Sequence, residues 1–408
     1  MRPSARICAA VLLAEFVWPA ALAAQTPAPI RIGATASQTG VYAMDGQTLL
    51  RGYQLCIKHT NDKGGVLGRR LELLAADDES DPATAVRLYE KLITHDKVDV
   101  VLSPFNSAVT DPVANVTEKR KMPMVAPIAS ATSMYKKGRK FLFSVSPPPD
   151  TWLEGLIDLA AKRGLKTVAL IHPDDLGGRT IAQGTRELAK RKRLEVPFIE
   201  AFPPGSTDFS TVLTRVRDVN PDVLGAIPGS TEAAVAIVRQ LKALNVNPRM
   251  YGAAGTGGGS LYELLGRDAE FVYGAVAWLP ELVDLRAGGL IPIARQYPGV
   301  REFAAAYRRE YADADLNAFA AAAYGGCQIL VEAIRRAGAL GGAKLRDAIV
   351  KMDHNTVFGA FRVDHEGVQV AHKFVMSQWQ DGKRAIIWPE ELAPSTPRFP
   401  TPPWSQRR

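Results

Sequence analysis

The feature that most constrains how this chain can fold is a regular alternation that begins at Ile30. Short apolar runs such as IRIGATA, VDVVLS and MPMVAP are separated by longer segments whose apolar residues recur at helical spacing. Apolar strands alternating with amphipathic helices are typical of a parallel sheet that is covered by helices on both faces. The sequence therefore predicts an α/β fold.

The alternation occurs twice, and a proline-rich passage separates the two series. The segment FLFSVSPPPDTW contains three consecutive prolines, Pro147–Pro149, which exclude a helix or a central strand. A second series follows, with strands predicted in TVALIHP, EVPFIEAF and DVLGAIPG. A length of 408 residues also favours more than one domain. We therefore predict two lobes, each with its own parallel sheet.

The C-terminal part of the chain breaks this alternation. The segments EFAAAYRREY, AFAAAAYGGCQILVEAIRRAG and KLRDAIVKM predict helices with no strands between them, and FGAFRVDHEG and HKFVMSQWQDG predict a hairpin. Residues 391–408 are rich in proline and predict a flexible tail.

The N-terminus has the pattern of a secretory signal peptide, residues 1–23. Arg2 and Arg6 precede an apolar run, and Ala21-Leu22-Ala23 supplies the small residues of a cleavage site. A frayed N-terminal helix is the alternative. No later apolar run is long enough to span a membrane, so we expect a soluble protein exported to the periplasm.

Motifs for cofactors and catalysis are missing from the sequence. The glycine-rich stretch RMYGAAGTGGGSL has Ser260 where a dinucleotide fingerprint needs its third glycine, and no Lys-Ser/Thr pair follows. The histidines have no metal-ligand spacing, and no G-x-S-x-G elbow occurs. The basic clusters Lys119–Lys121 and Lys190–Arg193 lack interleaved aromatics, so we interpret them as solvated helix ends rather than a nucleic-acid surface. No catalytic residue, metal or cofactor is predicted.

Two serines and two cysteines have open interpretations. Ser107 and Ser130 follow predicted strands, at the sheet edge where open α/β folds bind ligands, and suit an anion held by neutral dipoles. Helix capping is the alternative for both.

Cys56 and Cys327 lie in helical patterns; buried free thiols are favoured, and one long-range disulfide is the alternative.

From about Ile30 to Trp379 the chain resembles the periplasmic binding proteins of branched-chain amino-acid-type ABC transporters, which have the type I fold. The resemblance is carried by IRIGATASQTGVYAMDG, NDKGGVLGRRLELLAADDESDP, SPFNSAVTDPV, MVAPIASAT and VALIHPDDLGG. It implies two Rossmann-like lobes joined by three crossings, near Ser146, Trp278 and Thr356. Lobe I would comprise residues 30–146 and 279–355, and lobe II residues 147–278 and 356–390.

The resemblance also implies a ligand site between the lobes. A ligand carboxylate would be held at Ser107 and Ser130, with Ala129 beside them. The acidic residue that pairs with an amino acid's ammonium is matched by Ala254, and the usual second-lobe aromatic by Leu176. The cysteine pair of some members is matched by Ser80 and Asn106, so the family's usual disulfide is not expected. The predicted walls of the cleft are Tyr42, Phe105 and Trp152.

These features predict a binding protein without turnover, the solute-binding subunit of an ABC importer that captures a small carboxylate-bearing ligand by hinge closure. Because Ala254 replaces the acid, we expect a ligand without a free α-ammonium, unless Asp45, Asp150, Asp174 or Asp175 supplies the missing charge. The expected partners are this ligand and a membrane permease, and the protein is expected to be a monomer. The alternatives are a ligand-sensing receptor domain for amides, urea or amino acids, and an exported hydrolase, which is disfavoured because neither serine motif contains a histidine.

Overall fold

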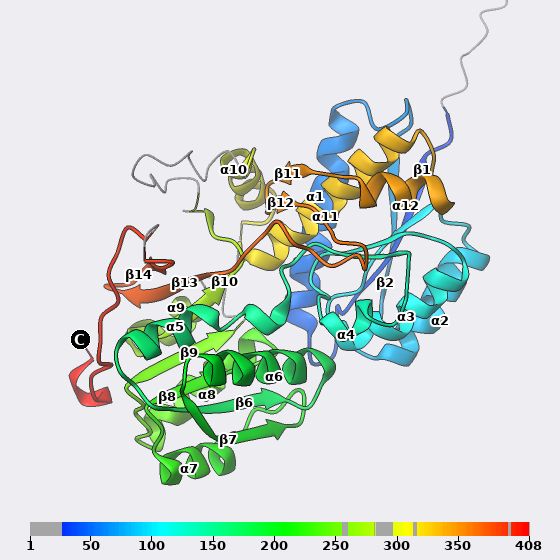
Figure 1. The fold of residues 1–408 in the computed structure, drawn as a ribbon. Helices are drawn as coiled ribbons and strands as arrows, with labels where there is room; N and C mark the ends of the chain where they lie inside the picture. The colour runs from blue at the N-terminus through cyan, green and yellow to red at the C-terminus, as the bar shows by residue number, and fades with distance from the viewer. Residues whose placement is uncertain are drawn as a thin grey trace, which may run out of the picture.

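The computed structural model describes residues 27–254, 260–280, 282, 297–312, 316–390 and 393–407. The predicted signal peptide and residues 255–259 of the glycine-rich stretch lie outside the described residues. Two α/β lobes lie side by side, and the N-terminal elements share one lobe with the late helices α11 and α12 (Figure 1). The predicted fold class is confirmed by this arrangement and by its solved relatives, reported below.

The first lobe contains a five-stranded sheet in the order β2-β1-β3-β4-β5, and every pairing in it is parallel. Asp81 begins the second helix as the alternation predicts, because its carboxylate accepts a hydrogen bond from the amide of Thr84. The strands are β1 (Ile30–Ala36), β2 (Leu71–Asp77), β3 (Val100–Leu102), β4 (Met124–Ala126) and β5 (Leu142–Ser144). The helices are α1 (Ala43–Asp62), α2 (Pro82–Thr94), α3 (Ser107–Lys119), α4 (Thr132–Tyr135), α10 (Val300–Glu310), α11 (Ala318–Ala337) and α12 (Gly342–Val350).

The second lobe contains a seven-stranded sheet in the order β14-β13-β10-β9-β8-β6-β7. Its first five strands in the sequence run parallel, and the last two add an antiparallel edge. The strands are β6 (Thr167–Pro173), β7 (Glu195–Phe202), β8 (Val223–Ala226), β9 (Met250–Ala254), β10 (Tyr273–Val276), β13 (Val375–Gln380) and β14 (Lys383–Trp388). The helices are η1 (Pro149–Thr151), α5 (Glu154–Lys162), α6 (Leu176–Arg191), α7 (Ser210–Val219), α8 (Thr231–Ala243), α9 (Ser260–Leu265), η2 (Gly266–Ala269) and η5 (Trp404–Gln406).

The chain passes between the lobes three times, and the third passage differs from the prediction. The first two lie between β5 and η1 and just after β10. The third was expected near Thr356, but Thr356 lies in β11 (His354–Thr356), which pairs with β12 (Gly359–Phe361). The chain then stays on the first lobe, where the Gln369 amide donates to the Ser144 hydroxyl at 2.8 Å. The passage therefore lies between Gln369 and the start of β13.

The predicted hairpin between FGAFRVDHEG and HKFVMSQWQDG is wrong, because the two segments belong to different sheets. The first pairs with β11, and the second pairs with β14. Asp381 and Gly382 join β13 to β14, and both have positive φ angles. An Asp-Gly pair is the usual signal for a two-residue hairpin turn. That signal was present in the sequence and marked the true hairpin.

The described part of the proline-rich tail, residues 393–407, packs on the second lobe instead of being flexible. The Thr401 amide donates to the Arg249 carbonyl at 3.0 Å, and the Trp404 indole donates to the Val246 carbonyl at 2.9 Å. The Arg407 guanidinium donates to the side chain of Asn247 at 2.6 Å. The prolines leave only the short turn η5 as a regular element here, but they do not prevent tertiary packing.

Cys56 and Cys327 form a disulfide, so the preference for free thiols was wrong. The bond joins α1 to α11, whose Cα atoms are 6.2 Å apart at this point and 271 residues apart in the sequence. Gly52 allows the close approach of the two helices, because an added Cβ would meet the Ala320 carbonyl oxygen at 2.5 Å. The bond links a late helix to the first helix of the chain, with which it shares one hydrophobic core in the first lobe.

Replacing both Cys56 and Cys327 with Ala is expected to lower the free energy of unfolding by about 2–5 kcal/mol, because the crosslink closes a long loop in the unfolded chain. Urea denaturation measures the difference. A reductant should destabilise the wild type and leave the double variant unchanged. A double variant as stable as the oxidised wild type would contradict this expectation.

Candidate functional site

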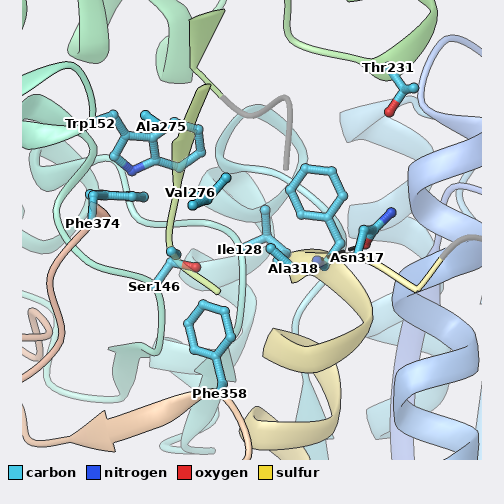
Figure 2. A pocket seen from close by; sticks show the side chains of 12 residues that line it. Ile128, Ser146, Trp152, Thr231, Ala275, Val276, Asn317, Ala318, Phe358 and Phe374 are labelled. Atoms are coloured by element: carbon cyan, nitrogen blue, oxygen red, sulfur yellow. Dashed lines mark hydrogen bonds between the residues drawn. The ribbon is translucent and has the colours of Figure 1, made fainter. Parts of the chain in front are cut away.

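A cavity lies between the lobes, where the carboxyl ends of strands from both sheets face each other, as expected for ligand sites in open α/β folds. It has two adjoining compartments, with volumes of about 90 Å³ and about 30 Å³. Ile128, Trp152 and Phe319 line both. The first compartment is also lined by Phe105, Asn106, Ser107, Ser130, Pro149, Pro173, Asp175, Gly177, Gly178, Ile181, Ile227, Gly229, Ser230 and Ala254. The second is also lined by Ser146, Thr231, Ala275, Val276, Ala277, Asn317, Ala318, Phe358 and Phe374 (Figure 2).

Five of the eight residues predicted for the site line this cavity. They are Phe105, Ser107, Ser130, Trp152 and Ala254. Phe105 packs edge to face against Phe319, with ring centroids 5.2 Å apart, so the two rings form one aromatic wall. The prediction thus brought together residues that follow β3, β4 and η1 with the last residue of β9, although they are far apart in the chain.

The other three predicted residues do not line either compartment. Ala129 is fully buried, and its carbonyl accepts a hydrogen bond from the Tyr135 hydroxyl at 2.6 Å. Leu176 packs across the lobe boundary on the apolar cluster around α3. Tyr42 directs its hydroxyl to Asp175, at 3.3 Å from Oδ2. Ala129 therefore supports the wall beside it, and Leu176 and Tyr42 contribute to the contact between the lobes.

The two serines present hydroxyl groups to the first compartment. The Ser107 hydroxyl oxygen accepts a hydrogen bond from the Ala131 amide at 3.2 Å, which leaves its own proton available for a ligand acceptor. Ser130 is 2% exposed and lines the same compartment. Neither side chain caps a helix, because Asn106 caps α3 and α4 has no side-chain cap. The capping alternative for the serines is therefore wrong.

Four helices direct their N-termini to the cavity, two from each lobe. Their caps are Asn106 for α3, Asp175 for α6, Ser230 for α8 and Asn317 for α11, and each cap side chain accepts a hydrogen bond from an amide of its own helix. A helix N-terminus carries a partial positive charge of roughly half a unit. The cavity is therefore suited to an anion, although none of the described residues that line it is a Lys or Arg.

Asp175 is the one acidic side chain that lines the cavity among the described residues. Burial raises its pKa, and hydrogen bonds from the Gly178 amide and the Tyr42 hydroxyl act in the opposite direction. The Gly178 bond, 2.7 Å long, uses Oδ1, and the Tyr42 bond uses Oδ2. Both carboxylate oxygens of Asp175 therefore already accept a hydrogen bond from the protein.

The other aspartates considered as substitutes for the missing acid lie elsewhere. Asp174 is exposed and forms an ion pair with Arg179. Asp150 lines a separate outer groove with Arg179. Asp45 is buried in α1, where it accepts a hydrogen bond from the Thr231 hydroxyl at 3.2 Å. The Thr231–Asp45 bond and the Tyr42–Asp175 bond both connect the two lobes.

The second compartment is largely apolar and is bounded by the crossing segments. In Figure 2, Trp152, Ala275, Val276 and Phe374 lie on one side of Ile128, and Asn317 and Ala318 lie on the other. His372 supports this wall from behind: its Nε2 bonds to the Ala277 carbonyl at 2.7 Å, and its ring packs on Phe358 with centroids 4.7 Å apart. A carbonyl partner requires Nε2 to be the donor, so Nδ1 carries no proton.

The lining residues that sequence reasoning missed include three helix caps. Asn106, Ser230 and Asn317 each directly precede a helix, and the first two follow a strand. A capping residue at the end of a strand in an α/β series marks a helix N-terminus at the ligand-binding edge. That signal was in the sequence and would have found Asn106 and Ser230. Phe319 and Thr231 had no such signal, because only the tertiary structure brings them to the cavity.

The described residues contain no group of three or more His, Cys, Asp or Glu side chains that could hold a metal ion. A search of the same residues found no helix with the length and apolar character needed to cross a membrane.

Comparison with known proteins decides the family. Residues 29–384 match the family described as periplasmic binding protein, which is most of the chain. The chain belongs to the periplasmic binding protein family. The predicted resemblance to the branched-chain amino-acid type is confirmed by the relatives described next.

The relatives are distant but similar along most of the length. The Leu/Ile/Val-binding protein homolog 7 of Brucella abortus is 22% identical, over 93% of this chain and 96% of the relative. The Leu/Ile/Val-binding protein BraC3 of Rhizobium johnstonii is 27% identical, over 91% of this chain and 97% of the relative. The solved substrate-binding protein LivJ from Streptococcus pneumoniae, in complex with isoleucine, has a TM-score of 0.75, 23% identity and coverage of 88% and 99%. A solute-binding protein from R. palustris in complex with benzoate has a TM-score of 0.76, 19% identity and coverage of 88% and 95%.

The buried His372 generates a pH prediction. Burial lowers the pKa of His372 from 6.5 to about 4 in the folded protein. The unfolded chain therefore binds more protons between these values, and stability should fall as the pH falls from about 6.5 towards 4, by roughly 3 kcal/mol in total. His372→Gln keeps a donor for the Ala277 carbonyl and does not titrate. Urea denaturation across this pH range should give a smaller slope for the variant, and equal slopes would contradict the assignment.

Proposed function

We propose that this protein is the extracytoplasmic solute-binding subunit of an ABC importer and that it captures a small carboxylate with an apolar body between its lobes. The observation that carries the proposal is the convergence of four helix N-termini on a cavity that also contains the hydroxyls of Ser107 and Ser130. Amide and hydroxyl donors stabilise an anion without a fixed counter-charge, which allows release as well as capture.

The size of the cavity supports a ligand on the scale of benzoate or leucine. One water-sized group needs about 10–15 Å³ of such volume. The first compartment, at about 90 Å³, thus holds about six to nine non-hydrogen atoms, and the second, at about 30 Å³, holds about two or three more. The apolar walls of the first compartment, which include Phe105, Trp152 and Phe319, suit a flat or branched hydrocarbon body.

The charges around the cavity favour a ligand without a free α-ammonium. Ala254 lines the first compartment at the position where amino-acid binders of this type carry an acid. Asp175 is present nearby, but it caps α6 and both its oxygens accept hydrogens from the protein. A desolvated ammonium without a dedicated partner costs several kcal/mol. The names of the relatives include both possibilities, since one solved protein holds isoleucine and another holds benzoate.

Replacing Ser107 or Ser130 with Ala is expected to weaken binding of benzoate, or of the acid that binds best in a screen, by about 1.5–3 kcal/mol. Each substitution removes one hydrogen bond to a charged acceptor. Isothermal titration calorimetry measures the change. Ser133→Ala is the matched control, because Ser133 is exposed, lies close to Ser130 in the sequence and does not line the cavity. Affinity unchanged within twofold in both single variants would exclude these serines as the carboxylate site.

Asp175→Asn tests the charge of the ligand. The Asn side chain can still cap α6, while the negative charge is removed. A carboxylate without an ammonium should bind about two- to tenfold more tightly to this variant, because a like charge is gone. Asp174→Asn makes the same change in net charge outside the cavity and should alter affinity by less than twofold. A loss of affinity in Asp175→Asn, together with tight wild-type binding of a free amino acid, would show that Asp175 pairs with an ammonium.

A further inference from the structure

The second compartment has a chemical character different from the first, and this difference bears on the ligand. Among the described residues, none of the side chains that line it is ionisable, and its walls are mostly alanine, aliphatic and aromatic groups. The Ser146 hydroxyl is the polar group nearest the crossing segments, and Ser146 is 5% exposed. Figure 2 shows its oxygen on the side chain that lines this compartment.

The hydrogen bond that Ser146 already makes determines which ligand group it can recognise. Its hydroxyl donates to the Pro127 carbonyl at 2.6 Å, so its proton is committed. The remaining lone pairs of the oxygen can only accept. Thr231, on the same compartment, is in a similar state, because its hydroxyl donates to Asp45. The oxygens of Ser146 and Thr231 therefore favour a hydrogen-bond donor on the ligand, in contrast to the N-termini of α8 and α11, which also reach this compartment.

The two compartments adjoin, since Ile128, Trp152 and Phe319 line both, and the chain limits how far apart their polar ends can lie. Pro127 and Ser130 are three residues apart, a length of chain that spans at most about 10 Å. Ser130 lies at the carboxylate end of the cavity, and Ser146 is hydrogen-bonded to Pro127. A benzene ring with a carboxylate at one end and a short group in the para position can span this separation.

We propose that the second compartment is a subsite for the distal end of the ligand, and that Ser146 accepts a hydrogen bond from a hydroxyl group there. The inference rests on the proposed function, since it places the carboxylate at Ser107 and Ser130. The ligand class is a hydroxy-substituted aromatic monocarboxylate. A second carboxylate beside Ser146 is disfavoured, because its oxygens would face the Ser146 oxygen and none of the described residues that line the compartment is cationic.

The test compares ligands of equal size by isothermal titration calorimetry on the mature protein. 4-Hydroxybenzoate and 4-methylbenzoate differ by a hydroxyl in place of a methyl group, and benzoate and terephthalate complete the set. Wild-type protein should bind 4-hydroxybenzoate about three- to tenfold more tightly than 4-methylbenzoate. Ser146→Ala should reverse this order, since an apolar subsite without the acceptor prefers a methyl group. Ser133→Ala should keep the wild-type ratio.

The outcomes separate this inference from the proposed function. If benzoate binds and 4-methylbenzoate binds as tightly as 4-hydroxybenzoate, the subsite is wrong and the carboxylate site stands. The same conclusion follows if terephthalate binds more tightly than 4-hydroxybenzoate. If none of the four acids binds the wild type, the proposed ligand class is wrong, and the proposed subsite is then wrong as well. The wild-type comparison decides the matter even if Ser146→Ala does not fold, because it needs no variant.

Discussion

The rest of this structure depends on one constraint, namely that a parallel strand must be followed by a helix that runs back across the sheet. Each such turn places the N-terminus of a helix, with amides that have no partner within the helix, at the carboxyl edge of the sheet. In this chain β3, β6 and β8 deliver α3, α6 and α8 to the same cavity, because the two sheets face each other across the crossing segments. The donors of the site are therefore a consequence of the fold, and the sequence has only to supply caps and hydroxyls.

The lobes and most strands could be predicted from the sequence because each rests on local pattern. IRIGATA and TVALIHP are buried strands with the bounds that their apolar runs indicate. The disulfide could not be predicted, because the pairing of Cys56 with Cys327 depends on α1 and α11 lying against each other, which no local pattern states. The third crossing was misplaced because β12 turns back on β11 and the Gln369 amide then bonds to Ser144, a contact between residues 225 positions apart that no local pattern states.

Residues that line the cavity were predicted where their position follows from the end of a single strand. They were missed where the position depends on how the two lobes meet. Ser107 and Ser130 follow strands of one sheet, so their place at the edge follows from the α/β pattern. Tyr42 was expected to be a wall, but its hydroxyl bonds to Asp175 of the other lobe. That partner is 133 residues away in the sequence. A contact of this kind depends on how the lobes are oriented, and periodicity carries no information about orientation.

The contacts between lobes also determine how affinity and closure are linked. The Tyr42–Asp175 and Thr231–Asp45 hydrogen bonds join polar groups that water would otherwise satisfy, so each contributes a net stabilisation of only about 0.5–1.5 kcal/mol. Two bonds of this strength make closure easily reversible. A ligand held by Ser107 and Ser130 of one lobe and by the ends of α6 and α8 of the other adds its own bonds only when both lobes are in place. In the proposed function, part of its binding energy would drive closure, and the population of the closed form would follow ligand occupancy. The groups that would hold the ligand are amides and hydroxyls, which form weak contacts. Such contacts permit the lobes to separate again.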